Sequence, residues 1–157
     1  MQMKKDMLTL LTNNLTAMAI HLCTCVVLLP FGFIWENSVW DDLLLDRGLK
    51  SIALNVLIVG IHTLILLCAY FRIGKKYINS THNALLDILS VVLITVILTV
   101  VVLAFYQKPL AGIVVIPIYP LSETISFFCG INLKYCYLIM SIVPSLVMWA
   151  GIVSKKG

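Results

Sequence analysis

Four long hydrophobic segments without a charged residue follow one another along the chain. They cover residues 7–35, 51–71, 88–107 and 135–154, and their lengths are 29, 21, 20 and 20 residues. An α-helix needs roughly 20 apolar residues to cross the hydrocarbon core of a bilayer. Each segment reaches that length, so the pattern predicts four transmembrane helices over about 8–34, 51–71, 84–106 and 135–153.

The composition also indicates a membrane protein. Of the 157 residues, 61% are hydrophobic and 11% are charged, and the mean hydropathy is +1.05. A soluble globular chain carries roughly 25% charged residues. The connections between the predicted spans are too short for a second folded domain, which excludes a fused soluble enzyme or a nucleotide-binding module. We therefore expect one all-α membrane domain over residues 1–157, built as a four-transmembrane-helix bundle.

Lysine and arginine residues predict the orientation of this bundle. Four spans bring both termini to one side, and the side richer in Lys and Arg is the cytoplasmic one. The side of the termini carries Lys4, Lys5, Arg72, Lys75, Lys76, Lys155 and Lys156, whereas the other side carries Arg47, Lys50, Lys108 and Lys134. We therefore expect both termini in the cytoplasm. Contact with anionic membrane lipid explains the net charge of +4, and direct binding of nucleic acid is not expected.

A short external helix is predicted from Ser38 to Arg47. Ser38 followed by Asp41 resembles a capping box, which starts a helix. Asp42 and Asp46 lie one turn apart and could share a cation, but the glycine-bearing pattern of a calcium loop is absent. We interpret these aspartates as the water-facing side of a helix at the membrane interface.

The second external connection, residues 107–134, is predicted to fold onto the bundle as a cap. Its uncharged stretch 109–122 carries three prolines and is too short to cross the membrane. A short interfacial helix is expected from Ser122 to Cys129, ended by Gly130. The alternative for this connection is a re-entrant element that lines a pore.

Polar residues inside the predicted spans are candidate functional residues, because unpaired polar atoms are costly in hydrocarbon. Asn14 and His21 lie in the first span, Asn55 and His62 lie in the second, and each pair is seven residues apart on one helix face. We expect the two faces to meet and to form hydrogen bonds between the helices. A proton or ion route through the histidines and a haem iron held by them are the alternatives.

The five cysteines do not predict a disulfide framework. Cys23, Cys25 and Cys68 lie within predicted spans, where thiols behave as small apolar groups. Cys23 and Cys25 are about 200° apart on a helix, so only one of them can share a face with a histidine ligand. We therefore expect neither a metal site nor a cofactor. Cys129 and Cys136 could form a disulfide in an oxidising compartment, or they could pack as free thiols.

Two pairs of small residues, each with a spacing of four, indicate close approach between helices. Thr95 and Thr99 in the third span and Ser141 and Ser145 in the fourth span are each four residues apart. Small side chains at this spacing let helix backbones approach within a membrane. We interpret these residues as contacts between copies of the chain and expect a homo-oligomer, of which a tetramer is one form.

The connection Arg72 to Asn83 is compact and basic, and it ends in residues that cap helices, so the third span is expected to begin near Ala84. The short tails and this connection are the only predicted cytoplasmic surfaces. Arg72, Lys75 and Lys76 are therefore candidate docking residues for a soluble protein partner. Anchoring of the same residues to anionic lipid is the alternative.

The sequence lacks residues that known small membrane enzymes require. Quinone-linked thiol oxidases need an external Cys-x-x-Cys motif, which is absent here. Lipoprotein signal peptidases need two aspartates at the outer edge of the bilayer, whereas the outer aspartates of this chain all lie between Asp41 and Asp46. We therefore expect a membrane subunit that is not an enzyme.

The overall layout resembles that of the KwaA family, the membrane subunits of the two-protein Kiwa anti-phage system. The similarity lies in the size, the four predicted spans, the basic start Met-Gln-Met-Lys-Lys-Asp and the compact loop Arg72 to Asn83. This resemblance implies a homo-oligomer of the bacterial inner membrane that senses phage-related membrane events. It also implies a cytoplasmic partner, KwaB, that acts on phage DNA. A small ion or proton channel, a transporter subunit or a holin-like pore would share this layout and is the alternative.

Overall fold

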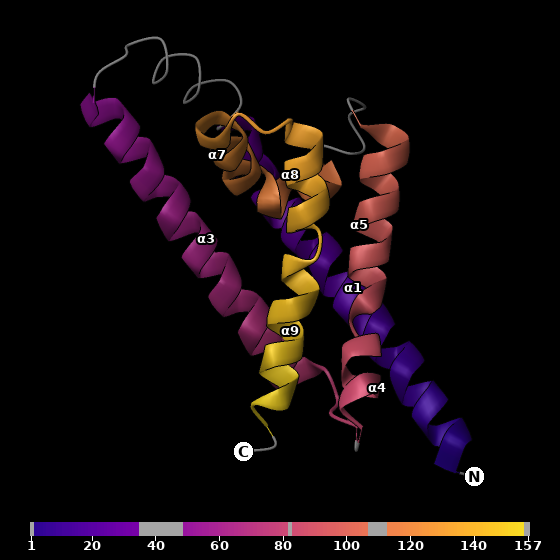
Figure 1. Cartoon of the computed structure of the whole chain (residues 1–157). Helices are drawn as coiled ribbons and strands as arrows, with labels where there is room; N and C mark the ends of the chain where they lie inside the picture. The colour runs from indigo at the N-terminus through magenta and orange to yellow at the C-terminus, as the bar shows by residue number, and fades with distance from the viewer. Residues whose placement is uncertain (1, 35–48, 82, 107–112, 156–157) are drawn as a thin grey trace.

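The computed structural model describes residues 2–34, 49–81, 83–106 and 113–155. These residues are helical apart from short connections, and no strand occurs among them, which confirms the predicted all-α class. The elements in chain order are α1 (Gln2–Ile34), α3 (Leu49–Tyr77), α4 (Ala84–Leu89), α5 (Val92–Phe105), the 3-10 helix η2 (Ile116–Ile118), α7 (Tyr119–Cys129), α8 (Leu133–Met140) and α9 (Val143–Val153) (Figure 1). The predicted external helix from Ser38 to Arg47 lies outside the described residues.

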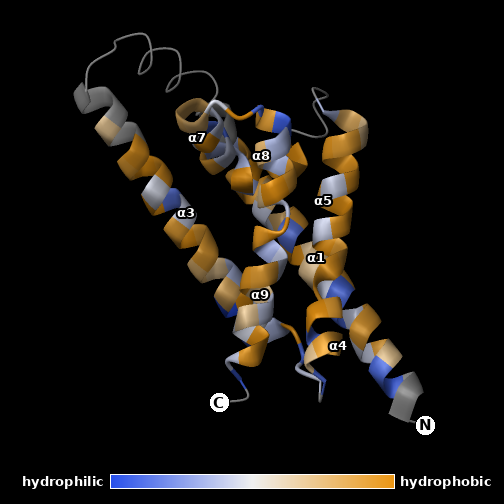
Figure 2. Cartoon of the chain, in the orientation of Figure 1, coloured by the Kyte–Doolittle hydropathy of each residue, from blue (hydrophilic) through white to orange (hydrophobic). Residues whose placement is uncertain are grey.

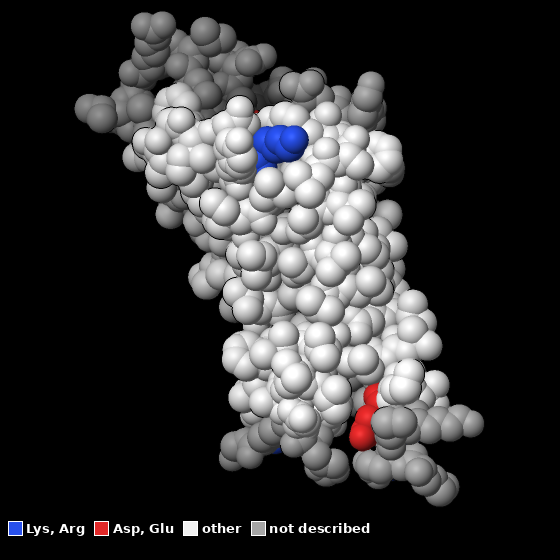
Figure 3. Space-filling model, turned by 45° about the vertical axis from the view of Figure 1, so that its right-hand side comes forward, with Lys and Arg blue, Asp and Glu red and all other residues white. Residues whose placement is uncertain are grey.

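Three helical stretches are long and apolar enough to cross a membrane. They are Lys5–Pro30 in α1, Val56–Tyr77 in α3 and Leu133–Val153 across α8 and α9, whereas Val92–Phe105 and Ile113–Cys129 are apolar but shorter. Figure 2 shows hydrophobic residues along the length of α3 and α5. On the face seen in Figure 3, the charged side chains of the described residues lie toward the two ends of the molecule. This distribution is compatible with a membrane protein.

The segment predicted as one continuous third span is divided into two helices. α4 begins at Ala84, as predicted, because the Asn83 side chain accepts the Leu85 N–H at 2.8 Å and so caps the helix. α4 ends at Leu89 and α5 begins at Val92, so the prediction of one unbroken helix is wrong. Neither proline nor glycine marks this break in the sequence. Its physical cause is a side chain of α1, described with the site below.

The fourth predicted span is also divided, into α8 and α9. Pro144 has no N–H, so the helical hydrogen bond to the Met140 carbonyl cannot form. The chain turns at Ser141 and Ile142 before α9 begins. α8 and α9 nevertheless follow one another along nearly the same line (Figure 1), which keeps them together as one membrane-length stretch.

The boundaries of α7 differ in part from the prediction. α7 begins at Tyr119, ahead of the predicted start at Ser122, because the preceding 3-10 helix leads directly into it. Pro120 fits its first turn, where an N–H has no helical partner. The helix ends at Gly130, as predicted, and the φ of 65° there is a left-handed conformation that glycine adopts without strain.

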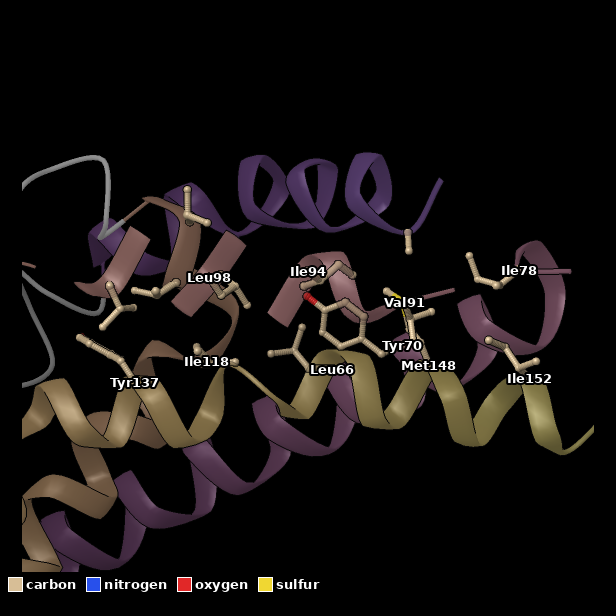
Figure 4. Packing of buried hydrophobic residues seen from close by; sticks show 14 residues of the cluster. Leu66, Tyr70, Ile78, Val91, Ile94, Leu98, Ile118, Tyr137, Met148 and Ile152 are labelled. Carbon is tan, nitrogen blue, oxygen red and sulfur yellow. The ribbon is translucent and has the colours of Figure 1, made fainter. Parts of the chain in front are cut away.

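The hydrophobic core lies where α3, α5 and α9 meet. Figure 4 shows Leu66 and Tyr70 of α3, Ile94 of α5 and Met148 of α9 gathered in one cluster. Ile118 of η2 belongs to the same cluster, so η2 packs into the bundle.

α3 packs mainly against α9, and the two backbones come into direct contact. Gly74 of α3 lies against the Met148 carbonyl, and Gly151 of α9 lies against the Phe71 carbonyl. A side-chain carbon added to Gly74 would stand 2.7 Å from the carbonyl carbon of Met148, well inside van der Waals contact. The approach of these two helices therefore depends on glycine at both positions.

Both ends of the chain lie at the same end of the molecule (Figure 1). The connection 78–83 between α3 and α4 lies there too. We call this the terminal end, and we call the end at which α7 meets α8 the opposite end.

Candidate functional site

His21 of α1 is 1% exposed and belongs to a hydrogen-bonded group inside the bundle. Its Nδ1 lies 2.8 Å from the Tyr70 hydroxyl, and its Nε2 lies 3.3 Å from the carbonyl oxygen of Val114. A carbonyl oxygen can only accept, so in the neutral imidazole Nε2 carries the hydrogen and Nδ1 accepts the hydroxyl hydrogen of Tyr70. Cys25, one turn further along α1, donates its thiol hydrogen to the same carbonyl at 3.5 Å.

The Val114 carbonyl that accepts these donors lies where the helix is irregular. The α-helical residues 113–115 tighten into the 3-10 helix η2, and Pro117 lacks an N–H. A carbonyl left unpaired in an apolar interior is costly. By satisfying it, His21 and Cys25 hold α1 against this connection, while Tyr70 joins α1 to α3. The contacts position helices against one another.

The three described members of the predicted polar cluster, Asn14, His21 and His62, lie in different places. The described hydrogen bonds of His21 go to the Tyr70 hydroxyl and to the Val114 carbonyl. Tyr70 lies about two helical turns after His62 in α3. His62 is half-buried in α3, Asn14 lies at the break between α4 and α5, and the side chain of Asn55 is outside what the structure describes. The sequence analysis missed Tyr70, although a hydroxyl within an apolar span was the signal that could have found it.

Asn14 explains why α4 and α5 are separate helices. Its Nδ2 donates to the Leu89 carbonyl at 2.7 Å, and its Oδ1 accepts the Leu93 N–H at 3.1 Å. These backbone groups belong to the end of α4 and the start of α5, where helical partners are missing. The amide of Asn14 therefore takes the place of backbone hydrogen bonds at the break.

The neighbouring Asn13 holds the connection 78–83 in the same way. Its Oδ1 accepts the Asn79 N–H at 3.0 Å, and its Nδ2 donates to the Asn79 carbonyl at 2.8 Å and to the Ser90 hydroxyl at 3.1 Å. Asn13 is 1% exposed, so these bonds are protected from water. α1 is thereby fixed to the terminal end and to the break between α4 and α5.

The four residues predicted to contact a second copy face one another within a single chain. Thr95 donates to the Ser145 hydroxyl at 2.8 Å, and the hydroxyls of Thr99 and Ser141 are 3.1 Å apart. Ser145 donates in turn to the Val91 carbonyl at 2.7 Å, and both serines are buried. Their hydroxyls therefore join α5 to α8 and α9 within one chain, and the expected contact of these residues with a second copy stays a prediction.

A second polar group lies at the terminal end. Asp87 is fully buried, and its Oδ1 accepts the Thr81 N–H at 2.6 Å and the Thr81 hydroxyl at 2.8 Å. Lys155, just beyond α9, donates from Nζ to the Ile78 carbonyl at 2.6 Å. Partial burial lowers the pKa of the Lys155 ammonium, and the negative charge of Asp87 acts in the opposite direction. From the sequence, Lys155 was used to predict the orientation, and Thr81 and Ile78 were not named as candidate site residues.

The predicted docking residues are exposed at the same end. Arg72, Lys75 and Lys76 lie in the last turns of α3, and we call them the basic triad. The ammonium of Lys76 stands over the ring of Tyr77, 5.3 Å from its centroid, and Tyr77 itself is 54% exposed. The terminal end thus presents positive charge and an aromatic ring beside the tightly bonded connection 78–83.

The cysteines show no disulfide. All five lie within the described residues and are free thiols. Cys129 is exposed at the end of α7 and Cys136 is buried in α8, so the structure has the alternative in which they pack without a bond. Across the described ranges, no three His, Cys, Asp or Glu side chains gather as ligands of a metal ion would.

Comparison of the chain with protein-family models, with curated proteins and with solved structures finds no match. Function must therefore be argued from the site itself.

Proposed function

We propose that this chain is a non-enzymatic membrane subunit that holds a soluble, acidic protein partner at the cytoplasmic face of the bacterial inner membrane. The observation that carries the proposal is the exposed basic triad of Arg72, Lys75 and Lys76 at the terminal end. A cluster of like charges attracts surfaces of opposite charge and accelerates their encounter. The interior contacts support an anchoring role, because they fix helices against one another.

The outward faces of the helices support placement in a membrane. Large apolar side chains are exposed there, for example Val27 at 75% and Leu64 at 63%. Such faces are costly in water and are solvated well by lipid tails. In this proposal α4 and α5 together form the third span in chain order, in addition to the three membrane-length stretches of α1, α3 and α8 with α9. Hydrocarbon tolerates the break between them because Asn14 and Ser145 satisfy the freed backbone groups.

Both termini are cytoplasmic in this proposal, because the side of the termini carries most of the lysines and arginines. We expect a reporter that is active only in the cytoplasm to be active when fused after Gly157. The same reporter inserted after Ile131, between α7 and α8, should be silent. A fusion after Gly157 that is active only outside the cytoplasm would contradict this topology.

Several copies of the chain would strengthen partner binding through avidity, because repeated weak contacts act together. We propose a homo-oligomer, with a tetramer as one form, assembled through exposed apolar faces. The layout resemblance to the KwaA family offers KwaB as a candidate for the partner. A phage-defence role is the corresponding proposal for the biological context.

Reversal of charge at the basic triad tests the partner proposal. We expect the combined variant Arg72→Glu, Lys75→Glu and Lys76→Glu to capture at least about tenfold less of the soluble partner from lysate of the native host, because its electrostatic attraction is lost. Quantitative mass spectrometry of the captured proteins measures this, with size-exclusion chromatography to confirm that assembly is unchanged. Lys134→Glu, at the opposite end, is the control and should capture as much as the wild type.

Two results would contradict the partner proposal. One is repeated recovery of the wild-type chain alone. The other is full partner capture by the triple variant. If the basic triad serves only to hold anionic lipid, the triple variant will instead show altered insertion or topology.

A further inference from the structure

The connection between α3 and α4 is held from its inner side at three of its described residues, Ile78, Asn79 and Thr81. The carbonyl of Ile78 accepts a hydrogen bond from Lys155, and the Ile78 side chain is fully buried. Both backbone groups of Asn79 are bonded to the buried amide of Asn13. Both donors of Thr81 point to the buried carboxylate of Asp87. Three separate elements, α1, α4 and the residues after α9, therefore fix this short connection.

The outer side of the same region is open. Ser80 and Asn83 are exposed, as are Tyr77 and the basic triad that precede them along the chain. Hydrogen bonds to a buried carboxylate are charge-assisted and stronger than neutral ones. A short connection whose backbone is bonded on the inner side and whose outer side chains are exposed is a preformed surface. A partner that binds it has little ordering entropy to overcome.

We propose that residues 78–81 and Asn83, which lie between α3 and α4, are part of the docking surface, and that Asn13 and Asp87 are the positioning residues that hold this connection in the shape the partner recognises. This inference rests on the proposed function, and it specifies the partner further: a soluble acidic protein that recognises a fixed surface formed by Tyr77, Ser80, Asn83 and the basic triad. Asn13 and Asp87 act from inside, without touching the partner.

Limited proteolysis tests the positioning role without any partner. We expect trypsin to cleave after Arg72, Lys75 or Lys76 about tenfold faster in Asp87→Ala and in Asn13→Ala than in the wild type in mild detergent, because loss of the buried hydrogen bonds lets the connection open locally. Thr12→Ala is the matched control, since Thr12 is exposed and, among the residues that the structure describes, its hydroxyl donates to the Leu8 carbonyl of its own helix. It should be cleaved at the wild-type rate.

Asp87→Asn covers the case in which an alanine variant does not assemble. The asparagine keeps one oxygen acceptor for Thr81 and loses the charge, so its cleavage rate should lie between those of the wild type and Asp87→Ala. Circular dichroism and size-exclusion chromatography identify the variants that are assembled. Unchanged cleavage in every assembled variant at positions 13 and 87 would overturn the inference.

The second measurement is capture of the soluble protein that the wild type recovers from host lysate. We expect assembled Asp87 and Asn13 variants to capture several-fold less of it, although the basic triad is intact. Faster cleavage with unchanged capture would overturn the docking role of the connection. Faster cleavage in a chain whose wild type captures nothing would instead overturn the proposed function, and leave the positioning of the connection by Asn13 and Asp87 established.

Discussion

Gly74→Ala should lower the stability of the protein by about 3 kcal/mol or more, because α3 and α9 cannot keep their present approach. The new side-chain carbon would meet the backbone of Met148, with its Cα at 2.8 Å and its carbonyl group closer still. Backbone atoms in the middle of a helix cannot rotate away as a side chain can, so the whole helix must shift. Gly151→Ala should act similarly, since its side chain would meet the carbonyl of Phe71.

Thermal unfolding in mild detergent measures this effect, and Gly60→Ala is the matched control. Gly60 also lies in α3, but apart from its own neighbours and helix backbone no atom of the described residues is within 4 Å of the position its side chain would take. Alanine there should leave the melting temperature unchanged or raise it slightly, because alanine favours helix over glycine by about 1 kcal/mol. Equal melting temperatures for Gly74→Ala and Gly60→Ala would show that the two backbones are not in contact.

Asn14→Leu is expected to have the second large effect. It would leave the Leu89 carbonyl and the Leu93 N–H without partners among apolar residues, at a cost of about 1–3 kcal/mol for each group. We expect a total loss of about 3 kcal/mol in unfolding experiments in detergent. The leucine is similar in size to asparagine, so the effect comes from lost hydrogen bonds more than from lost volume.

Thr24→Val provides the comparison for the Asn14 variant. Thr24 also lies in α1, but its hydroxyl bonds to the Ile20 carbonyl of the same helix, which already has a backbone partner there. Its replacement should change stability by less than about 1 kcal/mol. If Asn14→Leu is as stable as Thr24→Val, α4 and α5 can join into one continuous helix without Asn14, and the assigned cause of the break is wrong.

Local sequence signals predicted helix ends correctly where the cause is local. Asn83 caps α4 with its own side chain, and Gly130 ends α7 through a conformation that glycine prefers. Both effects act within a few residues, so they can be read from the sequence. The predicted start at Ser122 failed because the tertiary packing of the preceding 3-10 helix extends α7 toward the N-terminus.

Features that depend on distant residues could not be predicted in the same way. The break after Leu89 has no proline or glycine, because its cause is Asn14, 75 residues earlier in the chain. Small hydroxyl residues at Thr95 and Ser145 correctly suggested close helix contacts, but spacing alone does not distinguish a contact within one chain from a contact between copies. Whether such a contact forms within one chain depends on which helices are neighbours, and the spacing of small residues does not show this.

The hydrogen bond between Lys155 and Ile78 also has a consequence for biosynthesis. The two residues are 77 positions apart, and every helix from α4 to α9 lies between them. A chain that emerges from the ribosome starting at its N-terminus can bring Asn13 and Asp87 to the connection 78–83 while later helices are still being made. Lys155 reaches Ile78 only after α9 has taken its place beside α3. The hydrogen bond between Lys155 and Ile78 is therefore the last of these contacts to form at the terminal end, after the preceding helices have taken their places.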